Sequence, residues 1–159
     1  MDAEAFRAAF LRMMHNKENP FHPLVWINGD PEIGPRTYIG GLSEVNAKGA
    51  RVVIGADCDI ASFVAINVAD SHRQAIGLAD KPDCRDIVIG DHVFIGSHSA
   101  ILGGAVIGHH SVIAAGTILR ACEVPPYSLV VGSPAVIKPG YYLKEAEAAS
   151  QVKSPKESS

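Results

Sequence analysis

The stretch Ile89–Val124, IGDHVFIGSHSAILGGAVIGHHSVIAAGTILRACEV, repeats one pattern every six residues. Each unit opens with an aliphatic residue, usually continues with glycine or alanine, and most units carry a small residue at the fifth position. A period of six matches neither the 3.6-residue turn of an α-helix nor the simple alternation of a flat strand. It is typical of a short strand followed by a tight corner, with the β-branched residue inside and the small residues allowing the chain to turn.

The same pattern is present upstream. The first positions of all the units are Ile33, Ile39, Val45, Ile54, Ile60, Ile66, Ile89, Ile95, Ile101, Ile107, Ile113 and Leu119. Three units make one triangular coil, and successive coils stack at the strand spacing of about 4.8 Å. We therefore predict an all-β fold, a parallel β-helix of about four to five coils.

Composition narrows the class of protein further. The chain has 159 residues, 47% of them hydrophobic and 19% charged, which is enough for one globular domain with a sizeable core. A net charge of −3 gives no general attraction to nucleic acid or to an anionic membrane. No apolar run approaches the about 18 residues of a membrane span. Three scattered cysteines and a start without a signal-peptide pattern favour reduced thiols and a cytoplasmic location.

The flanks of the repeat differ from it. Residues 2–16 have helical spacing and are expected to pack over the first coil, so residues 1–22 are predicted to form a helical cap. The β-helix domain is predicted over 23–140, with an extruded loop at 72–88 where the repeat is interrupted. Residues 141–159 are predicted to hold a short helix and a disordered tail that covers 153–159.

The repeat from Ile33 to Pro134 resembles the hexapeptide-repeat acyltransferase family, whose members fold as left-handed parallel β-helices. The run AAGTILRACEVPPYSLVVGSPA is especially similar to the last coils of its acetyl-CoA-dependent members. The resemblance implies a left-handed β-helix, a sugar O- or N-acetyltransferase, and a homotrimer with its sites between neighbouring subunits. The acceptor would be a hydroxyl or amino group on a sugar or a nucleotide-linked sugar.

His72 occupies the position where the repeat calls for an aliphatic residue, just before the interruption. In galactoside, maltose and xenobiotic acetyltransferases of this family, a histidine at this kind of site is the general base. Neutral imidazole can accept a proton from a hydroxyl or amino group near neutral pH. Asp70 or a backbone carbonyl would hold the imidazole tautomer. Two plainer interpretations stay open: His72 only marks the polar start of a loop, and Asp70 only caps a turn.

The resemblance also implies sites for acetyl-CoA and for the acceptor. Ser97, Ala115 and Gly116 would line the thioester and pantetheine, while Arg120 and Lys138 would lie near the nucleotide phosphates. The chain departs from the family here, because it reads SPAVIK where the usual ending is closer to NPAKVIK. Arg120 has a plainer interpretation as an exposed solenoid side chain. For the acceptor, Glu44 and Asn46 are the candidates.

Two other function classes remain open. His92, His98 and His110 all take the fourth position of a unit, and some hexapeptide proteins are zinc carbonic anhydrases. Their G-H-x4-H step is missing here, because Ser97 follows Gly96 and Leu102 and Gly103 occupy the later slots. No metal site is therefore predicted. The remaining alternative is a non-catalytic scaffold that binds no CoA.

Overall fold

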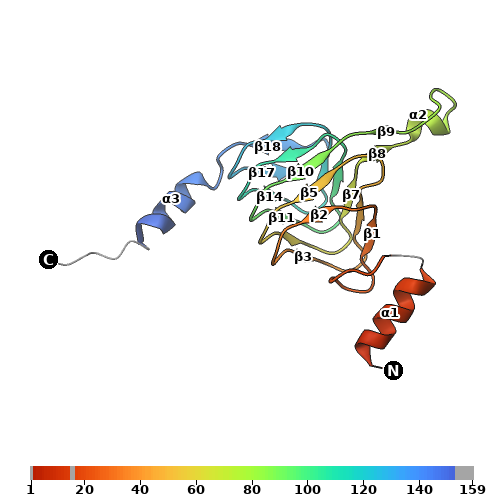
Figure 1. The fold of residues 1–159 in the computed structure, drawn as a ribbon. Helices are drawn as coiled ribbons and strands as arrows, with labels where there is room; N and C mark the ends of the chain where they lie inside the picture. The colour runs from red at the N-terminus through yellow and green to blue at the C-terminus, as the bar shows by residue number, and fades with distance from the viewer. Residues whose placement is uncertain (1, 15–16, 153–159) are drawn as a thin grey trace.

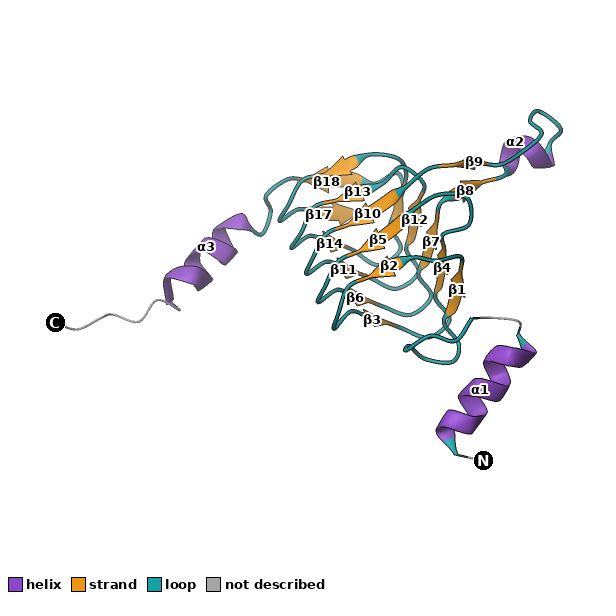
Figure 2. Cartoon of the chain, in the orientation of Figure 1, coloured by secondary structure: helices purple, strands orange, loops and turns teal. Residues whose placement is uncertain are grey.

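The computed structural model describes residues 2–14 and 17–152. It is a parallel β-helix of the predicted class, with three sheets that form the sides of a prism (Figures 1 and 2). The chain visits sheet A, sheet B and sheet C in turn, and each strand pairs in parallel with the strand one coil away. Within these three sheets the exception is the last strand, which turns back and pairs antiparallel with its predecessor.

The strand bounds follow the repeat. Sheet A holds β1 (Trp26–Asn28), β4 (Glu44–Asn46), β7 (Ala65–Asn67), β12 (Ala100–Leu102) and β15 (Ile118–Leu119). Sheet B holds β2 (Glu32–Ile33), β5 (Val52–Ile54), β10 (Ile87–Ile89), β13 (Val106–Ile107) and β16 (Glu123–Val124). Sheet C holds β3 (Tyr38–Ile39), β6 (Asp59–Ile60), β11 (Phe94–Ile95), β14 (Val112–Ile113), β17 (Leu129–Val131) and β18 (Val136–Lys138).

The first position of each unit fills the interior, as predicted. From Ile39 to Leu119 these residues are at most 1% exposed, and only Ile33, in the first coil, is half-buried. The small second positions allow the coils to approach each other. A Cβ on Gly96 would lie 2.4 Å from the backbone nitrogen of Ala115, in the next coil. The second-position glycines are therefore a condition of the stacking itself.

The fourth position of the units has a backbone role that the period did not reveal. Most fourth positions turn the corner in the left-handed region, among them Arg36, Leu42, Asp57, Phe63, His92, His98 and His110, with φ between 54° and 63°. Glycine takes this position at Gly104 and Gly116. Left-handed conformations are uncommon for residues with a Cβ, and histidine is among the enriched types. The fourth-position histidines are therefore corner residues.

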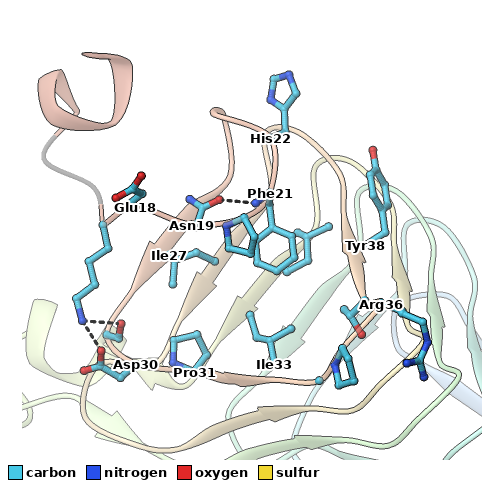
Figure 3. Close-up of a pocket in the computed structure, with 17 residues that line it drawn as sticks. Glu18, Asn19, Phe21, His22, Ile27, Asp30, Pro31, Ile33, Arg36 and Tyr38 are labelled. Carbon is cyan, nitrogen blue, oxygen red and sulfur yellow. Dashed lines mark hydrogen bonds and ion pairs between the residues drawn. The ribbon is translucent and has the colours of Figure 1, made fainter. Parts of the chain in front are cut away.

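Helix α1 (Ala3–Met13) begins at Asp2, whose carboxylate accepts a hydrogen bond from the Ala5 backbone N–H at 2.7 Å. It lies past the end of the first coil, below β1 in Figure 1, and faces the segment 18–23 that leads into the coil. A cavity of about 800 Å³ remains at the open end of that coil, lined by residues 17–39, with Phe21, Ile27 and Ile33 forming its apolar wall (Figure 3). The expected packing of the helix over the coil is thus not what the structure has.

The C-terminal helix α3 (Leu143–Val152) extends away from the last coil (Figures 1 and 2). The tail at 153–159 lies outside the described residues, so its predicted disorder stays a prediction. Within the described ranges no helix is long and apolar enough to cross a membrane.

The interruption of the repeat is a two-stranded antiparallel ribbon rather than an irregular loop. β8 (Ala69–Asp70) pairs with β9 (Asp83–Cys84), and the short helix α2 (His72–Ala75) lies beyond them. The ribbon projects from the corner between sheets A and B (Figure 2). It leaves the coil at Ala69, ahead of the boundary predicted at residue 72, and the chain rejoins sheet B at Ile87, before residue 88.

Candidate active site

His72 and Asp70 are in direct contact where the ribbon passes from β8 into α2. The Nδ1 atom of His72 lies 2.5 Å from Oδ1 of Asp70, and the same oxygen accepts the His72 backbone N–H at 3.2 Å. A carboxylate only accepts, so Nδ1 carries the proton and Nε2 is left with a free lone pair. Asp70 therefore does both things that the sequence left open: it holds the tautomer and it closes the turn.

The charge of Asp70 is stabilised in place. The hydrogen bond from the His72 imidazole, followed by the bond from its backbone N–H, holds the pKa of Asp70 below its ordinary value. The guanidinium of Arg120, and the His72 ring whenever it is protonated, act in the same direction. An ionised Asp70 favours the tautomer that leaves Nε2 as a proton acceptor.

The dyad opens onto a cavity of about 650 Å³. Its walls come from the two legs of the ribbon and from the strands of the next coils of sheet A, and its lining includes Asp83, Arg85, Leu102, Gly103 and Arg120. Arg85 is tied to Asp83 at 2.5 Å across one turn of the chain. The charge of Asp83 holds the pKa of Arg85 above its ordinary value. Among the residues that the structure describes, no side chain is hydrogen-bonded or ion-paired to Arg120, which lines this cavity.

A second group of predicted residues meets at the other edge of sheet A. Ser97 lies in the corner between β11 and β12, and Ala115 and Gly116 lie in the same corner one coil later. The Gly116 N–H donates to the Ser97 carbonyl at 2.9 Å. Gly116 has φ 73° and open space where a Cβ would be. The corner between sheets C and A therefore presents small residues and accessible backbone.

The predicted site residues thus fall into two groups. His72, Asp70 and Arg120 lie at the corner between sheets A and B, whereas Ser97, Ala115 and Gly116 lie at the corner between sheets C and A. Sheet A separates the two groups. One chain alone does not bring the imidazole to the small-residue corner.

Lys138 and the two acceptor candidates take other positions. Lys138 is on β18 of sheet C, with its ammonium 5.8 Å from the centre of the Tyr141 ring. Glu44 and Asn46 are on β4 of sheet A and already hold protein partners, since Glu44 accepts from Asn28 at 2.8 Å and Asn46 donates to Asn67 at 3.1 Å. The repeat pattern alone did not single out Asn67. Its signal was an asparagine at the last position of three sheet A strands, β1, β4 and β7.

His92, His109 and His110 stack on the corner between sheets B and C, whereas His98 lies at the corner between sheets C and A and stacks on Phe63. The ring centroids of His92 and His110 lie 4.6 Å apart, as their spacing in the sequence predicts. His109 contacts His110, and Tyr127 continues the column. Across the described ranges, no group of three or more histidine, cysteine or acidic side chains is arranged to hold a metal ion.

Comparison with known proteins gives the family. Residues 86–121 match the model of the bacterial transferase hexapeptide (six repeats). This chain is a hexapeptide-repeat protein. It is 30% identical to 2,3,4,5-tetrahydropyridine-2,6-dicarboxylate N-succinyltransferase of Xylella fastidiosa, over 87% of this chain and 54% of that protein. The hexapeptide-repeat protein described here spans about half the length of the curated relatives it matches, 54% and 40% for two of them.

Solved structures give the same family. The hexapeptide-repeat protein aligns with the polySia-specific acetyltransferase NeuO at 30% identity and a TM-score of 0.59, over 73% of this chain and 61% of that one. It aligns with the hexapeptide-repeat-containing acetyltransferase VCA0836 of Vibrio cholerae at 28% identity and a TM-score of 0.61, over 87% and 80% of the two chains.

Proposed function

We propose that this hexapeptide-repeat protein transfers an acetyl group from acetyl-CoA to a hydroxyl or amino group of a sugar or nucleotide-linked sugar. The observation that carries the proposal is the His72–Asp70 pair, which leaves Nε2 of the imidazole free at the edge of a cavity. Support for the cosubstrate comes from VCA0836, which was solved with acetyl coenzyme A and is 28% identical with a TM-score of 0.53. Support for a sugar acceptor comes from NeuO, named as specific for polySia.

The proposed reaction is a direct attack in a ternary complex. Nε2 of His72 removes the proton from the acceptor hydroxyl or amine as its oxygen or nitrogen attacks the thioester carbonyl. The tetrahedral intermediate then collapses, the carbon–sulfur bond breaks, and the imidazolium returns the proton to the departing CoA sulfur. Backbone N–H groups at the small-residue corner would stabilise the oxyanion. No cysteine is needed as a nucleophile, because the acetyl group passes to the acceptor in one transfer.

The two groups of site residues support a homotrimer with shared sites. Three copies around a threefold axis, each with sheet A facing inward, bring the sheet A–sheet B corner of one copy to the sheet C–sheet A corner of the next. His72 would then meet Ser97, Ala115 and Gly116 of a neighbouring subunit. The ribbon would cover that junction, since Ile76 and Leu78 near its tip are 65% and 61% exposed in the single chain.

The path proposed for CoA follows the corner between sheets A and B. A second cavity, of about 460 Å³, is lined by Ser133, Pro134 and Ala135 and shares Arg120 with the cavity beside His72. Acetyl-CoA would lie along both, with its thioester at His72 and its phosphates at Arg120, whose fixed positive charge suits them. Lys138 stays a candidate for the far end of the nucleotide. A cytoplasmic location is part of the proposal and rests on the scattered cysteines.

The first test is a calorimetric titration of metal-analysed protein with CoA, followed by transfer assays with hydroxy- and amino-sugars. We expect saturable binding at one site per subunit and transfer to at least one acceptor class. Absence of binding at millimolar CoA would overturn the proposal. The metal content would then distinguish a zinc carbonic anhydrase from a scaffold.

The second test is His72→Ala, with His109→Ala as a matched control on the distant corner between sheets B and C. We expect His72→Ala to lose transfer by about a hundredfold or more and to keep its affinity for CoA, because general-base catalysis contributes at this level. His109→Ala should retain turnover. Near-wild-type turnover by His72→Ala, measured as kcat at saturating substrates, would reject the assignment.

A further inference from the structure

Asn67 ends β7 and is the point from which the ribbon leaves sheet A. Its half-buried side chain makes two hydrogen bonds within the protein. The oxygen Oδ1 accepts the backbone N–H of Ala69 at 2.9 Å and Nδ2–H of Asn46 at 3.1 Å. The first of these bonds closes a turn over two residues, a local bond that asparagine side chains make readily. This oxygen therefore helps to set the direction in which β8 departs, beside the bond from the Val68 N–H to the Asn46 carbonyl at 3.2 Å.

A second turn of the same kind follows along the outgoing leg. Asp70 accepts the backbone N–H of His72 and also contacts its imidazole. Two side-chain-to-backbone turns in series, from Asn67 to Ala69 and from Asp70 to His72, thus lead from the rigid sheet to the base. A displacement of the first turn is carried into the position of the second, since Ala69, where the first turn ends, is directly followed by Asp70, where the second begins.

Asn46 supports this arrangement from the coil below. Its Oδ1 accepts the N–H of Lys48 at 3.1 Å, which fixes the turn after β4. The returning leg of the ribbon packs on that turn. Sγ of Cys84 lies 3.8 Å from the Lys48 carbonyl oxygen, and a Cβ added to Gly49 would lie 2.9 Å from the same sulfur. Asn46 therefore contacts the outgoing leg through Asn67 and underlies the returning leg through Lys48.

The asparagine column is not a requirement of the β-helix itself. At the same register of sheet A, the coil above Asn67 has Leu102, and its backbone stays in parallel pairing. Asn28, in the coil below Asn46, donates to Glu44 instead, and among the described residues it makes no bond to the ribbon. The side-chain amides of Asn46 and Asn67 bond at the start of the ribbon, which points to a role in positioning the residue that the ribbon carries, His72.

We propose that Asn67, with Asn46 behind it, is a positioning residue that sets the orientation of His72 through the root of the ribbon. The proposal rests on the proposed function of His72 as general base and gives Asn46 a role other than contact with the acceptor. Base catalysis depends on the direction of the Nε2 lone pair, and displacements of about 1 Å at a reacting group cost on the order of a hundredfold in rate.

The test compares Asn67→Leu with Asn67→Asp. Leucine fills the site, as Leu102 does one coil away, but removes the acceptor oxygen, whereas aspartate keeps an oxygen for Ala69 and Asn46. We expect Asn67→Leu to lower kcat about tenfold or more without weakening CoA binding, and Asn67→Asp to recover most of the loss. Wild-type kcat in Asn67→Leu, or a change confined to the KM of the acceptor, would overturn the proposal.

A readout that needs no turnover separates this proposal from the proposed function. The ¹⁵N chemical shifts of the His72 imidazole report its tautomer and its titration in the free protein. We expect them to change in Asn67→Leu and to stay as in the wild type in Asn28→Leu, which has the same register but no bond to the ribbon. A change in Asn67→Leu supports the positioning role even in a protein without transfer activity. Unchanged shifts in Asn67→Leu would reject it.

Discussion

At the scale of single residues, the fold depends on places where a side chain cannot fit. Gly108 is such a place, because a Cβ there would lie 2.5 Å from the backbone nitrogen of Pro126 in the next coil. Backbone cannot move aside as a flexible side chain can. His72 shows the opposite case: it departs from the repeat, and the position that would have been buried becomes the start of an exposed ribbon. Gly108 follows the repeat and His72 departs from it, and both roles can be recognised in the sequence because the surrounding repeat is regular.

The residue-scale prediction concerns Gly108→Ala. We expect the free energy of unfolding to fall by about 2 kcal/mol or more, because one added methyl forces the coils apart. The matched control is Gly77→Ala, in the ribbon, where φ is 75° but no atom lies within 4 Å of the new Cβ. There we expect a loss of about 1 kcal/mol, from backbone strain alone. Urea unfolding of the three proteins measures both, and equal losses would contradict the packing argument.

At the scale of elements, corners and ribbon behave differently from strands. The strands are only two or three residues long and bury alternate side chains, so their chemistry is nearly uniform. The three corners differ in composition. Small residues lie between sheets C and A, the ribbon between sheets A and B, and the histidine column between sheets B and C. A column of titratable rings in contact gives that last corner a dependence on pH.

The element-scale prediction uses this column. Burial, followed by the neighbouring His92 and His109, lowers the pKa of His110 below its ordinary value, while Asp91 acts weakly in the other direction. Between that lowered value and the ordinary value of about 6.5, the unfolded chain binds a proton that the folded chain does not. Stability from this source is therefore complete above the ordinary value and falls as the pH drops through the window.

Thermal unfolding at pH 8 and pH 5.5 measures the effect. We expect a smaller fall in Tm for His110→Asn than for the wild type, since asparagine tolerates the left-handed corner and does not titrate. The control is His98→Asn, at the same kind of corner but stacked on Phe63 instead of on histidines. It should keep the wild-type fall in Tm. The same fall in all three proteins would contradict the role of the column.

At the scale of the whole molecule, sheet A decides what one chain can do. It forms one side of the prism (Figure 1). The His72 cavity lies at one of its edges and the small-residue corner at the other. No bending of a stacked β-helix brings those edges together, because each coil is fixed by the hydrogen bonds of the next. If both groups belong to one site, as proposed, a complete site therefore requires a second copy.

The whole-molecule prediction is complementation between two inactive variants. His72→Ala removes the base, and Ala115→Trp fills the small-residue corner, so each protein alone should be inactive. In trimers assembled from equal amounts of both, about a quarter of the sites combine an intact His72 with an intact Ala115 from the neighbour. We expect about that fraction of wild-type kcat after joint refolding. A mixture without activity would mean that both halves belong to one chain.

The sequence by itself determined the period, the triangular coil, the buried aliphatic ladder and the place where the repeat is interrupted. These are local properties, since each unit contacts its neighbours in the same way and the pattern is written once per unit. It also indicated His72, because a polar residue at a core position is conspicuous. The stacking of His92 on His110 followed from their spacing alone.

Only the tertiary structure decided which corner each residue occupies. The left-handed fourth positions, the ribbon in place of a loop, the Asp70 contact and the link from Asn46 through Asn67 depend on backbone direction, which a period of six does not encode. The position of α1 past the end of the first coil depends on packing between segments with no repeat to guide it. Separation of the site into two groups across sheet A has the same cause: sequence spacing fixes height along the prism, whereas the path of the chain around it fixes the side.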